Sequence, residues 1–150
     1  MSKGISLKKQ DGSKLKIGVV KARWNHGIVE DLFIGCTQAL LDSGVKQKNI
    51  VTLEVPGSFE LPFVAKQLLK KKKLDAVICL GVIIKGGTTH DEYLSEAVSG
   101  AIMQLGLETG VPVIFGVLTS LTEEQAIARS TGVNNHGYWW GKNAVEMALL

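Results

Sequence analysis

The chain has 150 residues, 45% of them hydrophobic and 21% charged, a balance that is typical of one globular domain with a full hydrophobic core. The formal net charge of +3 is weak, and no basic stripe with interleaved aromatic residues occurs, so we expect no nucleic-acid partner. No apolar run is long enough to cross a bilayer, and the polar stretch from Met1 to Lys14 lacks a signal-peptide pattern. We therefore expect no membrane partner and a cytoplasmic protein.

The hydrophobic pattern predicts a flexible N-terminal arm at residues 1–14 and a single domain at 15–150. Short apolar runs predict β-strands at residues 16–21, 50–55, 76–84 and 113–118. Helical periodicity predicts helices at residues 28–43, from near 62 to 72, at 90–108, from Thr122 onward and, after a turn at 134–141, to the end of the chain.

Strands that alternate with helices and show no hairpin signal indicate a parallel sheet covered on both faces. The right-handed crossover rule then favours a three-layer α/β/α sandwich, in which a four-stranded sheet has the flavodoxin-like order 2-1-3-4. Cys36 and Cys79 fall within apolar runs and far apart, so we expect buried free thiols and no metal site.

Residues 81–93 carry the most informative pattern, because an apolar strand runs into Gly86 and Gly87 and a helix follows at once. Amides at a helix start lack intrahelical partners, and glycine lets the backbone approach a bound oxyanion. We expect Thr89 and Glu92 to form a capping box that places His90 in the first turn. The lysine of a nucleotide-hydrolase phosphate loop is missing, since Gly87 stands in its place.

Polar and aromatic residues also follow the other predicted strands, where ligands of open parallel sheets bind. Trp24 either packs in the core or lines a cleft, and Ser58 and Glu60 either bind a ligand or serve only as turn and helix-start residues. Histidine passes protons near neutral pH, which favours a functional His90 over a capping residue. Arg129 taken alone is typical of a surface charge. We expect Lys21 and His26 to be solvated.

Seven motifs occur in an order and spacing that resemble the 6,7-dimethyl-8-ribityllumazine synthase family. The resemblance runs from about Leu15 to the end of the chain, and the ordered set is more specific than any single motif. The motifs are Ala22-Arg23-Trp24-Asn25, the segment 55–62, the segment 81–90 with its glycines and His90, the segment 115–119, Glu124-Gln125-Ala126 with Arg129, Asn135-His136-Gly137, and the segment 144–147.

The resemblance implies an enzyme of riboflavin biosynthesis. Such an enzyme condenses 5-amino-6-(D-ribitylamino)uracil with 3,4-dihydroxy-2-butanone 4-phosphate, releases phosphate and water, and needs no metal or redox cofactor. It also implies a homopentamer with active sites shared between neighbouring subunits, and some members of the family assemble pentamers into a 60-subunit capsid. The alternatives are a non-catalytic flavin-binding module and a shell-forming protein on the same scaffold.

The resemblance also implies roles for single residues. The proton-transfer residue is His90, and the phosphate-binding residues are Gly86, Gly87, Thr88 and Arg129. The residues expected to bind the ribitylaminouracil are Trp24, Asn25, Ser58, Phe59, Glu60, Val82, Ile83, Ile84, Phe115 and His136. Phe115 and Arg129 are expected to come from the neighbouring subunit. Asp91 departs from the family pattern, in which the residue after the histidine is usually aromatic. The turn before His136 is shorter than in fungal relatives.

Overall fold

The computed structural model describes residues 9–150, and residues 1–8 of the predicted arm lie outside the described residues. The strands are β1 (Ile17–Ala22), β2 (Ile50–Val55), β3 (Ala76–Ile84) and β4 (Val113–Ser120). The α-helices are α1 (His26–Asp42), α2 (Leu61–Lys71), α3 (His90–Thr109), α4 (Glu123–Ser130) and α5 (His136–Ala148). Short 3-10 turns are η1 (Gln47–Asn49), η2 (Ser58–Glu60) and η3 (Gly132–Asn134).

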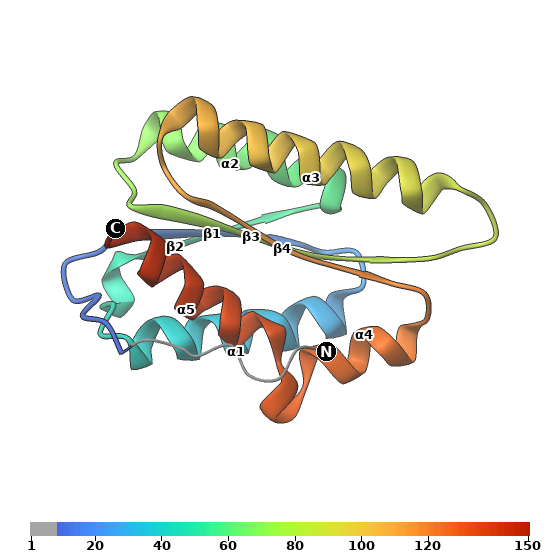
Figure 1. Cartoon of the computed structure of the whole chain (residues 1–150), viewed down its shortest axis with the longest axis horizontal. Coiled ribbons are helices and arrows are strands. Elements are labelled where there is room, and N and C mark those ends of the chain that lie inside the picture. The colour runs from blue at the N-terminus through green and yellow to red at the C-terminus, as the bar shows by residue number, and fades with distance from the viewer. Residues whose placement is uncertain (1–8) are drawn as a thin grey trace.

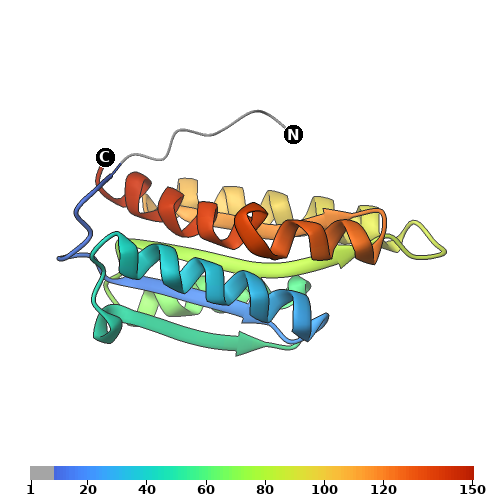
Figure 2. The same ribbon diagram turned by 90° about the horizontal axis from the view of Figure 1, so that it is seen from below.

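The sheet is parallel throughout and has the order β2-β1-β3-β4, which confirms the predicted fold class. Helices α2 and α3 cover one face, and α1, α4 and α5 cover the other (Figure 1). Seen from below, α1 and α5 lie side by side against the sheet (Figure 2). Residues from Ala76 to Ile83 of β3 are all buried, as expected for a central strand between two helix layers.

The N-terminal part of the described chain contacts the domain. The Gly12 amide donates a hydrogen bond to the Ser43 carbonyl oxygen at 2.7 Å, and a side chain at Gly12 would collide with Val45. Cys36 and Cys79 are buried free thiols, as predicted, and burial raises the pKa of each to about 12. Within residues 9–150, none of the helices is long and apolar enough to cross a membrane.

The predicted turn at residues 134–141 is wrong, because α5 begins at His136. The Asn135 side chain caps this helix by accepting a hydrogen bond from the Gly137 amide at 2.8 Å. Two glycines within this stretch allow close packing of α5 on α1. A Cβ atom at Gly141 would lie 2.6 Å from the Cys36 carbonyl oxygen of α1. Gly137 likewise leaves no room for a Cβ atom beside the Leu32 carbonyl.

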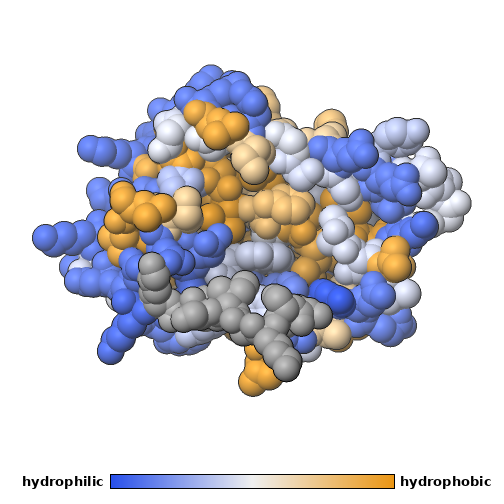
Figure 3. Space-filling view, viewed as in Figure 1, coloured by the Kyte–Doolittle hydropathy of each residue, from blue (hydrophilic) through white to orange (hydrophobic). Residues whose placement is uncertain are grey.

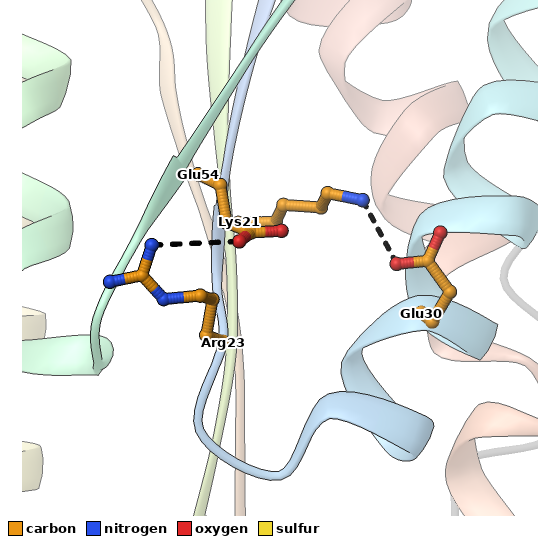
Figure 4. A network of polar contacts seen from close by, with 4 residues as sticks. All are labelled: Lys21, Arg23, Glu30 and Glu54. Carbon is orange, nitrogen blue, oxygen red and sulfur yellow. Dashed lines mark hydrogen bonds and ion pairs between the residues drawn. The ribbon is translucent and has the colours of Figure 1, made fainter.

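The expectation that Lys21 is solvated is also wrong. Its side chain is only 14% exposed, and its Nζ lies 2.9 Å from Glu30 Oε2 of α1 (Figure 4). The same Nζ lies 4.1 Å from the centroid of the Phe33 ring. Arg23 pairs with Glu54 of β2 at 3.7 Å on the other side of β1. The two ion pairs link the end of β1 to α1 and to β2. Because Arg23 is largely exposed, we attribute most of the anchoring to Lys21.

Candidate functional site

A cavity of about 640 Å³ lies at the carboxyl ends of β1, β2 and β3, where the sheet order predicts a ligand site. Its size suits a small organic molecule. The residues that line it are Trp24, Asn25, Gly57, Ser58, Phe59, Glu60, Val82, Ile83, Ile84, Gly86, Thr88, His90, Asp91 and Leu94. The structure thus brings together most of the predicted site residues in one chain.

Two aromatic rings line this cavity without packing in the core. Trp24 is 74% exposed and Phe59 is 65% exposed, so the core reading of Trp24 is excluded. Each ring is held by an ordered backbone, since the Trp24 amide donates to the Pro56 carbonyl oxygen at 3.1 Å and Phe59 lies within η2. Exposed rings on a fixed backbone can stack on a planar ligand.

Asn25 joins the first loop to the central strand. Its backbone adopts the left-handed conformation (φ 60°, ψ 45°), which asparagine tolerates better than most residues. Its Nδ2 donates a hydrogen bond to the Val82 carbonyl oxygen at 3.1 Å. This bond uses one of the backbone groups that were predicted to contact the ligand. Asn25 also lines the cavity, and its Oδ1 accepts no hydrogen bond from residues 9–150.

Ser58 and Glu60 border the cavity on the η2 side. Ser58 is buried, and the missing side chain of Gly81 on β3 makes room for its hydroxyl. Glu60 is the residue before α2 but makes no capping hydrogen bond with its side chain. The carboxylate of Glu60 is therefore not committed to the helix end and can face a polar ligand.

The glycine corner, defined here as Gly86 to Thr89, offers donors without partners. These residues are exposed, and their amides donate no hydrogen bond to any atom of residues 9–150. Neither Gly86 nor Gly87 has a positive φ, and a Cβ atom at either would meet nothing within 4 Å. Neither chain conformation nor packing within residues 9–150 therefore requires these glycines, and their lack of a side chain leaves the backbone open to close approach by a ligand.

The predicted capping box at the start of α3 is wrong, although the helix does begin at His90. Thr89 makes no capping hydrogen bond with its side chain, because its backbone (φ −84°, ψ 8°) is not in the extended conformation that a capping residue adopts. Thr88 Oγ1 instead accepts a hydrogen bond from the His90 amide at 3.3 Å. The His90 side chain is exposed and lines the cavity beside the glycine corner.

Four predicted site residues do not line the cavity: Gly87, Phe115, Arg129 and His136. Gly87 lies between two lining residues. Phe115 shares its face of β4 with Val113 and Val117, which pack on the α2 and α3 side. Arg129 belongs to α4 and His136 to α5, on the opposite face. These last three side chains therefore cannot complete the cavity of their own chain together.

His136 lies in an aromatic cluster near Arg129. Its ring stacks on Trp139 with centroids 4.6 Å apart and meets the edge of Trp140 at 5.9 Å. Burial lowers the pKa of His136, and the nearby Arg129 charge lowers it further. His136 Nε2 is buried and has no hydrogen-bond partner within residues 9–150. Arg129 itself donates from Nη1 to the Gln125 carbonyl oxygen at 2.9 Å.

Sequence reasoning did not assign three of the lining residues to the site: Gly57, Asp91 and Leu94. Gly57 belongs to the loop that was predicted to bind ligand. Leu94 lies on the face of α3 that carries the buried Val98, Ile102 and Leu105, and that face extends to the cavity near the start of the helix. Asp91 could have been noticed in the sequence, because the family that the chain resembles usually has an aromatic residue at this position.

Comparison with known proteins agrees with these motifs. The sequence model of the family described as 6,7-dimethyl-8-ribityllumazine synthase matches residues 14–150. A protein of that name from Schizosaccharomyces pombe is 46% identical over 150 residues, covering 98% of this chain and 94% of the relative. Another from Pyricularia oryzae is 41% identical over 187 residues, covering 99% of this chain and 94% of the relative. The chain therefore belongs to the 6,7-dimethyl-8-ribityllumazine synthase family.

Proposed function

We propose that this protein condenses 5-amino-6-(D-ribitylamino)uracil with 3,4-dihydroxy-2-butanone 4-phosphate to 6,7-dimethyl-8-ribityllumazine, the penultimate step of riboflavin biosynthesis, and that it acts in the cytoplasm. Family membership carries the choice of reaction. The choice of this cavity as the active site is supported by one observation: exposed rings, unpartnered amides and a histidine lie together in it. These are the groups needed to hold a planar ring, a phosphate and a proton in transit.

The ribitylaminouracil occupies the part of the cavity near Trp24 and Phe59. The exposed Trp24 ring stacks on the planar pyrimidine. Asn25 and the loop from Ser58 to Glu60 bind the ribityl chain and the ring edge through oxygen acceptors and backbone groups. Strand residues 82–84 contact the uracil with their backbone. Since the Val82 carbonyl already accepts from Asn25, the contacts of Ile83 and Ile84 carry more of this recognition.

The butanone phosphate binds with its phosphoryl group at the glycine corner. The amides of Gly86, Gly87 and Thr88 have no partner within residues 9–150 and can donate hydrogen bonds to an anion. The positive end of the α3 dipole also favours a negative charge there. Arg129 of a neighbouring subunit supplies the compensating charge. Arginine suits this role because its guanidinium makes paired hydrogen bonds to phosphate oxygens.

The reaction proceeds by imine formation, phosphate elimination and ring closure. The 5-amino nitrogen attacks the ketone carbon and an imine forms with loss of water. Elimination breaks the carbon–oxygen bond to phosphate, and the amides with Arg129 stabilise the departing dianion. The enol that remains takes up a proton at its terminal carbon and becomes a methyl ketone. The ribitylamino nitrogen attacks this carbonyl and closes the second ring with loss of a second water. His90 accepts and returns the protons, and most of the acceleration comes from holding two reactants together.

We propose that the enzyme is at least a pentamer. Phe115, Arg129 and His136 do not reach the cavity of their own chain, so they are useful to the reaction only at a neighbour's cavity. Large apolar side chains are exposed on α3, including Tyr93, Met103 and Leu107. Figure 3 shows hydrophobic residues gathered between the two helix layers on the face that carries β4. An exposed apolar surface of this kind supports subunit contact.

The test mixes purified protein with both substrates and follows the fluorescence of the lumazine product together with released phosphate. We expect one phosphate per lumazine. His90→Ala should slow turnover by about 10²-fold or more, since general acid–base catalysis contributes that much. Arg129→Ala should mainly raise the KM for the phosphate substrate. Protein that binds both substrates but yields no lumazine would rule out the proposed reaction.

A further inference from the structure

Gly81 lies within β3, a strand that is otherwise made of apolar side chains. Its neighbours in the pleat, Cys79 and Ile83, pack in the core on the α2 and α3 side, so Gly81 faces the same side. Its φ is not positive, and glycine inside a strand lowers stability. Chain conformation therefore does not require Gly81, and the reason for it must lie in the group that occupies the space beside it.

The Ser58 side chain of η2 occupies that space. A Cβ atom at Gly81 would collide with Ser58 Oγ, but it would lie 3.4 Å from Ser58 Cβ, an ordinary van der Waals distance. Leu61 Cδ1, at 3.2 Å, would have to move only slightly. A methyl group at position 81 would therefore turn the Ser58 hydroxyl to another staggered orientation and leave the backbone of η2 in place.

The Ser58 hydroxyl has no partner within the described chain. Ser58 is buried, yet its Oγ makes no hydrogen bond to any atom of residues 9–150. The unpartnered hydroxyls of Thr37 and Ser120 are sealed from solvent, whereas Ser58 Oγ is not. Because Ser58 lines the cavity, a ligand there can reach this oxygen. A buried hydroxyl without a partner disfavours folding, and a ligand that hydrogen-bonds to it removes that cost.

We propose that Gly81 is a positioning residue, whose missing side chain holds the Ser58 hydroxyl in the orientation that hydrogen-bonds to the bound ribitylaminouracil. This assignment rests on the proposed function. A serine side chain has three staggered orientations, and without a hydrogen bond to the protein only packing selects among them. Gly81 leaves open the orientation over β3, next to the strand residues 82–84 that are proposed to contact the uracil. The ligand carries N–H groups and hydroxyls that can pair with Ser58.

Binding of the second substrate does not depend on this hydroxyl. The phosphoryl group of the butanone phosphate is expected at the glycine corner, which begins only after the end of β3. Turning the Ser58 hydroxyl leaves the amides of that corner where they are. A change at Gly81 should therefore affect the pyrimidine alone, whereas general loosening of the fold would weaken the binding of both substrates.

The experiment measures calorimetric binding of 5-amino-6-(D-ribitylamino)uracil alone to the assembled protein, so that it does not depend on turnover. Gly81→Ala keeps the Ser58 hydroxyl but turns it away, and Ser58→Ala removes it. Each variant should bind the pyrimidine about 3- to 10-fold more weakly than the wild type, since one neutral hydrogen bond contributes that much. The double variant should bind no more weakly than either single variant, because both changes remove the same contact. The KM for the phosphate substrate should stay unchanged in all three.

Gly18→Ala is the matched control, because its Cβ atom would lie 2.8 Å from Leu68 Cδ2 and 2.9 Å from Leu74 Cδ1, in the same core layer. Gly18 is near the start of β1, away from the cavity, so this variant should melt at a lower temperature and bind the pyrimidine normally.

Three results would overturn the role of Gly81 alone. These are undiminished pyrimidine binding by Gly81→Ala or by Ser58→Ala, a double variant in which the two losses multiply, and an equal loss for the phosphate substrate. Wild-type protein that binds no pyrimidine would overturn it together with the proposed function.

Discussion

At the scale of single residues, the site is recognised by side chains that the fold does not need. Trp24 and Phe59 are exposed, Gly86 and Gly87 meet nothing, and Asp91 buries an unsatisfied oxygen. In a single chain without a ligand, each of these features either lowers stability or contributes nothing to it. Such departures from local consistency are expected where a protein binds a ligand.

His136 makes stability depend on pH near neutrality. Its folded-state pKa is lowered from the ordinary value of 6.5, so the unfolded chain takes up a proton first as the pH falls. The stabilising contribution of neutral His136 is complete above about pH 6.5 and is lost as the pH falls toward the folded-state pKa. Thermal melts between pH 8 and pH 5 should therefore show a falling melting temperature.

His136→Gln should flatten that fall, since the titrating group is removed. Arg129→Gln should flatten it in part, because the Arg129 charge is the second cause of the lowered pKa of His136. An unchanged profile in His136→Gln would show that another group is responsible for the pH dependence.

At the scale of elements, the sequence predicted those strand bounds and helix starts that depend on local hydrophobic periodicity and on capping residues. The bounds of β2 and β3 match the prediction. Thr122, where a helix was predicted to begin, caps α4 by accepting a hydrogen bond from the Gln125 amide at 3.2 Å. The start of α5 was missed, because Gly137 and Gly141 are set by contact with α1, which lies far away in sequence. Lys21 was missed for the same kind of reason, since its partner is on another element.

The features of the candidate site likewise fall into those that the sequence predicted and those that only the structure showed. The loops after β1, β2 and β3 were predicted to meet because parallel topology brings strand ends together, and they line one cavity. The unpaired Asp91 oxygen and the bond from Asn25 to Val82 depend on exact side-chain placement. No spacing rule reports such placement, so these features required the structure.

The close contact between α1 and α5 predicts a specific sensitivity. Gly141→Ala would place a Cβ atom 2.6 Å from the Cys36 carbonyl oxygen and 2.8 Å from the Ala39 Cβ. Both helices must then shift, so we expect the free energy of unfolding in urea to fall by about 1–3 kcal/mol. Gly27→Ala in α1 is the control, because its Cβ atom would meet nothing within 4 Å.

The control should be stabilised by about 0.5–1 kcal/mol, as expected for alanine in a helix. Both variants are compared at one protein concentration, since stability of an oligomer depends on it. Equal stability of Gly141→Ala and the wild type would contradict the packing assigned to this pair of helices.

At the scale of the whole molecule, the account requires sites built from two subunits. His90 belongs to the cavity, whereas Arg129 lies outside the cavity of its own chain. At a concentration of the phosphate substrate near the wild-type KM, the variants His90→Ala and Arg129→Ala should each have low activity. When the two are refolded together, about one site in four should combine an intact cavity with an intact neighbour, as follows from a closed ring with a repeated interface.

Activity of the mixture should therefore exceed the mean of the two separate variants, and light scattering should give at least about five times the 16.1 kDa of one chain. A mixture that is no more active than that mean would place both residues in the same subunit's site. A fully active monomer would also contradict shared sites.

The binding of phosphate at the glycine corner is the claim on which the proposed reaction most depends. Crystals of the assembled protein soaked in inorganic phosphate test it directly. We predict density within hydrogen-bond distance of the amides of Gly86, Gly87 and Thr88, with Arg129 of a neighbouring subunit on the far side. An empty corner, at a phosphate concentration that inhibits lumazine formation, would contradict the account.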